Sequence, residues 1–285
     1  MTRFVFVRFS LLARLPILAL SAAILLSVLL PPAPAAAASL EISPSAQAGF
    51  EKTTAKADSA TAARLNSSRQ NYASQLQGLS AYRQQAQELH SGAVKLAASV
   101  RQASGSIDRD AIRNQENRVA KVKSVYEPMY AGYTALNKRI RSAGSKESAK
   151  ALRMQADTIQ AAVQLARQSV RLQQEKLQKL TRERSVKIAA IRKTLSGLEA
   201  VSDELRVRKS TARIPESALR DALKDFSSAA RKGDAVLMER SLGSMLASSN
   251  QLLKQWDAIV ELERRYAAIA EQARSQLAGY GVIIG

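Results

Sequence analysis

The sequence predicts an all-α protein, an elongated antiparallel coiled coil or helical bundle of about five helices after a signal peptide. Glycine and proline are sparse, with 12 and 7 residues among 285, and aromatic residues make up only 5%. These counts favour helix over sheet. Apolar residues recur at spacings of three and four along almost every long stretch, which is the period of a helix that buries one face.

Residues 1–38 are typical of an export signal. They hold three arginines and no acidic residue, followed by an apolar run over residues 17–30 and a stretch of proline and alanine that ends at Ala38. A run of 14 residues is shorter than the roughly 20 that a bilayer span requires. Small residues before Ser39 suit a signal peptidase. We therefore expect cleavage near Ala38, with an uncleaved N-terminal membrane anchor as the alternative.

The first helix is expected over residues 44–102, with residues 39–60 frayed because their apolar stripe is thin. Its main apolar stripe repeats every seven residues, at Leu65, Tyr72, Leu79, Ala86, Ala93 and Val100. This repeat is typical of two helices that pair along their length.

The second helix is expected over residues 106–142 and the third over residues 146–209. Pro128 predicts a kink in the second helix, because a proline inside a helix removes one hydrogen bond and clashes with the preceding turn. The third helix would be nearly ~100 Å long at ~1.5 Å per residue. We assign residues 61–213 to these long coiled-coil helices.

A boundary is expected at residues 210–214, where Pro215 would open a short fourth helix. The sequence Arg231–Asp234 predicts a helix end that is followed directly by a new N-cap. These features define a C-terminal helical pair over residues 214–278. The last segment, residues 279–285, is apolar, β-branched and interrupted by glycine. We expect it to pack against the helices, and an exposed tail that a partner or protease recognises is the alternative.

The residue counts exclude several classes of enzyme and metal protein. The chain has no cysteine, so it has no disulfide, thiolate zinc site or cysteine nucleophile. A histidine-based triad or metal site would depend on His90 alone. Glu261 and Glu263 would point apart on a helix, and the chain has neither a glycine-rich phosphate loop nor a G-x-S-x-G motif. The sequence therefore predicts a non-enzymatic protein without a cofactor or metal.

Positive charge is concentrated in the third expected helix and its ends. The chain has 43 basic and 24 acidic residues, for a net charge of +19, and residues 138–213 alone carry +12. A field of this size attracts polyanions. The candidate polyanion-binding residues are Arg167, Arg171, Lys176, Lys179, Arg182, Lys187, Arg192, Lys193, Arg206, Arg208 and Lys209. The alternative is that the charge only keeps a long exposed helix soluble.

Three of the seven tyrosines, Tyr126, Tyr130 and Tyr133, share one stripe of the second expected helix. They are candidates for stacking against a sugar or a protein partner. Their spacing also matches the buried face, so ordinary core packing is the alternative.

These observations favour an exported, non-enzymatic coiled-coil protein that acts at the bacterial envelope as a scaffold or spacer. Its partners would be an anionic cell-wall polymer or the membrane surface. One alternative is a coiled-coil regulator of a separate cell-wall hydrolase or membrane complex. A helical pore-former is disfavoured because no long apolar run follows Leu30. Export and the absence of a nucleic-acid-binding motif disfavour nucleic acid as a partner. The sequence leaves open whether a helix pairs with a protein partner or with a second copy of the chain.

Overall fold

The structure is a computed structural model that describes residues 40–284, and the expected signal peptide lies outside the described residues. Its helices are α1 (Pro44–Lys56), α2 (Ser59–Ala103), α3 (Arg109–Arg141), α4 (Lys146–Lys232) and α5 (Ala235–Gly279), with a short 3₁₀ turn η1 (Ser104–Ser106). No strand occurs among these residues, which confirms the all-α prediction. A search of the same residues finds no helix with the length and apolarity of a membrane span.

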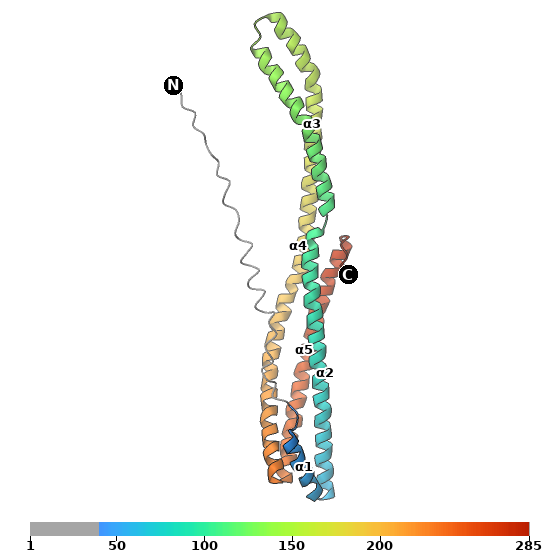
Figure 1. The fold of residues 1–285 in the computed structure, drawn as a ribbon, viewed down its shortest axis with the longest axis vertical. Coiled ribbons are helices and arrows are strands. Elements are labelled where there is room, and N and C mark those ends of the chain that lie inside the picture. Colours follow the sequence, from blue (N-terminus) through green and yellow to red (C-terminus); the bar gives the residue numbers. More distant parts are fainter. Residues whose placement is uncertain (1–39, 285) are drawn as a thin grey trace, which may run out of the picture.

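Three long helices, namely α2, the C-terminal half of α4 and α5, lie side by side over one end of the molecule (Figure 1). Contacts between their side chains show that α2 and α5 run in the same direction and that α4 runs opposite to α5. The three helices bury large apolar side chains between them, including Leu65, Tyr72, Leu219, Met238, Leu242, Leu252 and Ile259. This core follows the apolar stripes that the sequence predicts.

Beyond this section α3 folds back along the N-terminal half of α4 and forms a two-helix hairpin (Figure 1). We call residues 108–187 the arm, and residues 40–107 together with 188–284 the body. The apolar side chains buried in the arm are few and small, namely Val119, Ala156, Val163 and Val170. Two helices cover only one stripe of each other, so most of the arm surface is exposed.

Helix α1 differs from the expected frayed segment. The chain leaves helical geometry at Ala57, and Asp58 then caps α2, so α1 turns back against α4. The side chain of Phe50 is buried against Phe226, with ring centroids 6.1 Å apart. Gly49 permits this approach, since a Cβ there would lie 2.5 Å from the carbonyl oxygen of Ala230. One buried aromatic residue therefore holds a segment whose apolar stripe is thin.

Helix α4 continues through the expected boundary at residues 210–214 and through Pro215, so the separate fourth helix is absent. Proline costs an interior helix one hydrogen bond. Here Ala212, Pro215 and Leu219 are all buried, so the same face of α4 contacts the core on both sides of the proline. Helix α3 contains Pro128 within one helix, as the sequence predicts.

The turn between α4 and α5 confirms the predicted helix end and new cap. Gly233 takes a left-handed conformation with φ of 70°, which glycine adopts without strain. The Asp234 carboxylate then accepts a hydrogen bond of 3.0 Å from the backbone N–H of Leu237. This tight turn returns α5 along α4.

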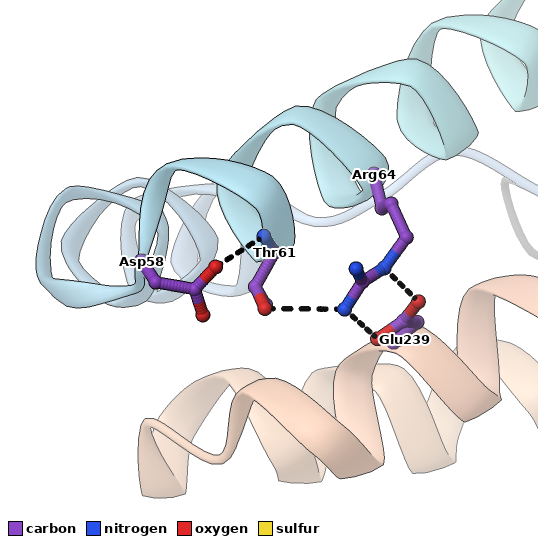
Figure 2. Close-up of polar contacts among 4 residues, drawn as sticks. All are labelled: Asp58, Thr61, Arg64 and Glu239. Carbon is purple, nitrogen blue, oxygen red and sulfur yellow. Dashed lines mark hydrogen bonds and ion pairs between the residues drawn. The ribbon is translucent and has the colours of Figure 1, made fainter.

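The start of α2 is tied to α5 by a short chain of polar contacts (Figure 2). The backbone N–H of Thr61 donates to Asp58 over 2.9 Å, and the Arg64 guanidinium donates to the Thr61 hydroxyl and to Glu239, with Nε 2.7 Å from Oε1. These bonds fix the parallel register of α2 and α5 at the base of the body. Glu239 in turn raises the pKa of Arg64.

The C-terminal segment packs against the body, as expected. Tyr280, Val282 and Ile284 contact the cluster formed by the ends of α2 and α5 and the middle of α4, whereas Ile283 is exposed.

Candidate polyanion-binding surface

The arm carries more positive charge per residue than the body. It holds 18 basic and 8 acidic side chains, for a net charge of +10 over 80 residues. The described body holds 22 basic and 16 acidic side chains over about twice that length, for a net charge of +6. Since the arm also buries little, most of its charged side chains are directed to solvent. The arm is therefore the stronger candidate for contact with an anionic surface.

The junction between arm and body is fixed by two basic side chains of α4. The Lys187 ammonium lies 2.7 Å from the carboxylate of Asp108, and the Arg184 guanidinium donates to the carbonyl oxygen of Gly105 over 2.7 Å. Asp108 has a left-handed backbone with φ of 52° and does not cap α3 with its side chain. Lys187, a predicted polyanion-binding residue, therefore has a partner within the fold.

The eleven predicted basic residues divide between the two regions. Arg167, Arg171, Lys176, Lys179, Arg182 and Lys187 lie in the arm, whereas Arg192, Lys193, Arg206, Arg208 and Lys209 lie in the body. Five of the eleven form ion pairs with described acidic residues, namely Arg171, Lys179, Lys187, Arg206 and Lys209. Within the described residues no carboxylate lies within 4.0 Å of the other six, so their charge is available to an external anion.

These eleven residues do not form one face of α4. At 3.6 residues per turn, Arg167 and Lys176 point to opposite sides of the helix, and Arg192 points away from Arg208. The basic residues therefore form a charged segment of α4 and not a patch on one of its faces. A field spread around the helix suits an extended, flexible anion better than a small ligand in a fixed pose.

The three tyrosines lie midway along α3. Tyr126 and Tyr130 are stacked with ring centroids 5.5 Å apart and an interplanar angle of 22°. The side chain of Tyr130 is 49% exposed, whereas Tyr126 and Tyr133 are half-buried against α4. The group therefore packs only in part and leaves Tyr130 about half exposed.

Sequence reasoning missed a polar cluster inside the body. The side chain of Glu263 is fully buried, and its two oxygens contact Nδ1 of His90 at 2.9 Å and Nζ of Lys209 at 3.1 Å. The ring centroids of His90 and Tyr266 lie 5.6 Å apart. Burial raises the pKa of Tyr266. The nearby charge of Arg101 lowers this pKa, and the charge of Glu263 raises it. A buried carboxylate requires such partners. Only the interruption of the apolar stripe at Glu263 signals this cluster in the sequence.

The described residues contain no group of three or more His, Cys, Asp or Glu side chains placed to hold a metal ion. Shallow grooves also occur among the described residues, and two of them lie in the body. One of about 580 Å³ lies between α1 and the α4–α5 turn and is lined by Lys52, Lys56, Arg231 and Lys232. Helices α1 and α4 end there, so these cations face the partial negative charge of helix C-termini. The other, of about 750 Å³, lies between α2 and α5 over Leu89, Gly92 and Ala268.

Comparison of the chain with protein-family models, with curated proteins and with solved structures finds no match.

Proposed function

We propose that the chain is an exported, non-enzymatic helical scaffold that binds a phosphate-rich anionic surface of the bacterial envelope through its arm. In this proposal the body is a coiled-coil-like bundle that holds the arm away from the rest of the molecule. The observation that carries it is the excess charge of the arm, +10 over residues 108–187, on a hairpin that buries little. The N-terminal segment supports export, because its basic start and short apolar run are typical of an export signal.

Wall polymers and lipid headgroups share phosphate chemistry, and either would be drawn to the same field. Arg167, Lys176 and Arg182 are exposed, spread around α4 and free of ion pairs with described residues. They can therefore contact an anion without breaking an internal bond. Lys187 and Lys209 would have to leave Asp108 and Glu263 to do so. We expect the first three residues to contribute most among the predicted set.

The test is binding to a soluble glycerol-phosphate polymer over increasing salt, with Arg167→Glu/Lys176→Glu/Arg182→Glu compared with Lys95→Glu/Arg240→Glu/Lys254→Glu. The second variant changes the net charge equally, at exposed body residues that also lack ion pairs with described residues. We expect the arm variant to weaken binding by about tenfold or more, with little effect of the body variant. Wild-type binding should fall steeply with salt, because mobile ions screen exposed charges beyond about 10 Å at 0.1 M. Equal loss in both variants would show that net charge alone, and not the arm, determines binding.

A further inference from the structure

Helix α4 carries a second row of apolar side chains in the arm, on the side that α3 does not cover. Met154, Leu165, Leu172 and Val186 are 51–70% exposed. Their spacings of 11, 7 and 14 residues bring them back to nearly the same direction on a helix of 3.6 residues per turn. The buried residues Ala156, Val163 and Val170 point the opposite way. The arm segment of α4 is therefore apolar on two opposite faces, of which only one has a partner within the described residues.

Single exposed apolar side chains are normal on a protein surface, but an aligned set requires an explanation. Six of the eleven large apolar side chains that the described residues expose belong to the arm, although the arm is about a third of the described chain. The other two in the arm are Val125 and Tyr130 of α3. The exposed apolar surface therefore coincides with the region of highest positive charge.

Basic side chains lie beside the row and, at Lys179, within it. Lys150, Arg171, Lys176, Lys179 and Arg182 all lie within about 100° of it around α4, by helical geometry. Glu147, Asp157, Glu175 and Glu183 share this side, and Glu175 and Glu183 form exposed ion pairs with Arg171 and Lys179 at 3.5 and 3.9 Å. The row thus has long cationic side chains beside it and a surplus of positive charge.

Four kinds of occupant can be compared for this face. A second copy would bring one arm of net charge +10 against another, which is repulsive. A partner helix requires two apolar rows that leave holes for its side chains, whereas the positions four residues after Met154, Leu165 and Leu172, where the second row would be, hold Thr158, Ser169 and Lys176. A wall polymer would meet the charges but gain nothing from Leu165 and Leu172. An anionic lipid surface meets both the charges and the apolar row, and it requires no side-chain register.

We propose that this face of α4 lies on an anionic lipid bilayer, parallel to its plane. Met154, Leu165, Leu172 and Val186 enter the boundary between headgroups and acyl chains, and the flanking lysines and arginines reach back to the phosphates. The inference rests on the proposed function, since it names lipid as the anionic surface that the arm binds. It adds an apolar contribution that charge alone does not provide.

The experiment measures binding of the chain from Ser39 onward, which contains every described residue, to vesicles of equal parts phosphatidylglycerol and phosphatidylcholine. Leu165→Ser/Leu172→Ser is compared with Val207→Ser/Ile214→Ser. The control pair lies on the same helix with the same seven-residue spacing, and it is 62% and 71% exposed, but it belongs to the body. We expect the arm pair to weaken vesicle binding by about tenfold and the body pair by less than about twofold. All four residues are exposed, so the thermal stability of both variants should stay near that of the wild type.

The soluble glycerol-phosphate polymer serves as the parallel measurement. Polymer binding that Leu165→Ser/Leu172→Ser leaves unchanged, together with weaker vesicle binding, supports the lipid inference. Vesicle binding equal to wild type would overturn that inference and leave the proposed function standing. Failure of the wild-type chain to bind either polymer or vesicles would overturn the proposed function itself. Self-association of the wild type in sedimentation that the arm pair abolishes would identify a second copy as the occupant and also overturn the lipid inference.

Discussion

The arm and the body are built from the same kind of helix, and α4 runs through both without interruption. They differ in how many partners each helix has. In the body, α4 packs along α5, contacts α1 and meets α2 through the Arg83–Glu216 ion pair, whereas in the arm it pairs with α3. All of the largest fully buried side chains lie in the body, among them Tyr72, Phe226, Leu242 and Leu252. In the arm the buried apolar residues are three valines and one alanine.

This difference shows how one continuous helix can pack into a core in one region and expose charged side chains in another. A helix with two or more partners buries most of its circumference, so its sequence is constrained by packing. A helix with one partner leaves most of its circumference free for charge, as α4 does between Lys146 and Lys187. Regions with few buried contacts also open more readily than the core. The body therefore provides most of the stability, and the arm exposes most of the circumference of its helices, with their charged side chains, to solvent.

The largest expected effect tests this division directly. Leu252→Ala in the body removes a fully buried side chain and should lower the free energy of unfolding by about 2–5 kcal/mol. Leu177→Ala in the arm makes the same chemical change at a half-buried position, and we expect less than about 2 kcal/mol, because solvent already covers part of that side chain. Urea unfolding followed by circular dichroism measures both. Similar losses would mean that the arm is as well packed as the body.

A smaller effect is expected for ion pairs. Lys209→Met removes the ammonium from the fully buried Glu263, whose remaining partner is His90. We expect a loss of about 1–3 kcal/mol, the cost of leaving a buried polar group without one of its hydrogen bonds. Arg171→Met removes a partner from the exposed Glu175 in the arm and should cost less than about 0.5 kcal/mol. The same unfolding measurement compares the two variants.

The double variant Lys209→Met/Glu263→Leu separates the buried charge from the packing around it. Replacing both members of a buried pair by apolar residues of similar size is often neutral or stabilising. We therefore expect the double variant to recover most of what Lys209→Met loses. No recovery would show that the shape of the site, rather than its charge, determines the cost of the single variant.

The sequence predicted the helices well because their signals are local. The repeat from Leu65 to Val100 became the buried stripe of α2, and Gly233 with Asp234 formed the predicted helix end and cap. Sequence spacing within one helix was sufficient for these features. The packing of the C-terminal tail was also correctly predicted, because exposed β-branched residues gain from any nearby apolar surface.

Features that depend on distant contacts were not predicted. Pro215 reads locally as a helix start, but its buried neighbours hold α4 continuous. Residues around Phe50 have a thin apolar stripe, yet the contact with Phe226 fixes α1. The partners of Glu263 lie 173 and 54 residues away along the chain, at His90 and Lys209. No spacing rule reveals such a cluster before the arrangement of the helices is known.

The smallest expected effect concerns the N-caps of the two regions. Asp58 caps α2 in the body, and hydrogen bonds from the Thr61 side chain and backbone hold its pKa below the ordinary value of 3.8. A lowered pKa in the folded state means that the ionised form stabilises the fold. Its contribution is complete above 3.8 and is lost as the pH falls through the lowered pKa. Asp108 at the start of α3 makes no such cap and binds Lys187 instead.

Asp58→Asn tests the charge without removing the cap, since asparagine also accepts a hydrogen bond at this position. We expect the variant to melt at a slightly lower temperature than the wild type near neutral pH. The difference should shrink as the pH falls below 3.8, because the wild-type carboxylate then becomes neutral as well. Thermal melting by circular dichroism over a pH series provides the measurement. Equal melting temperatures of variant and wild type throughout this range would show that the hydrogen bond, and not the charge, is what Asp58 contributes to the start of α2.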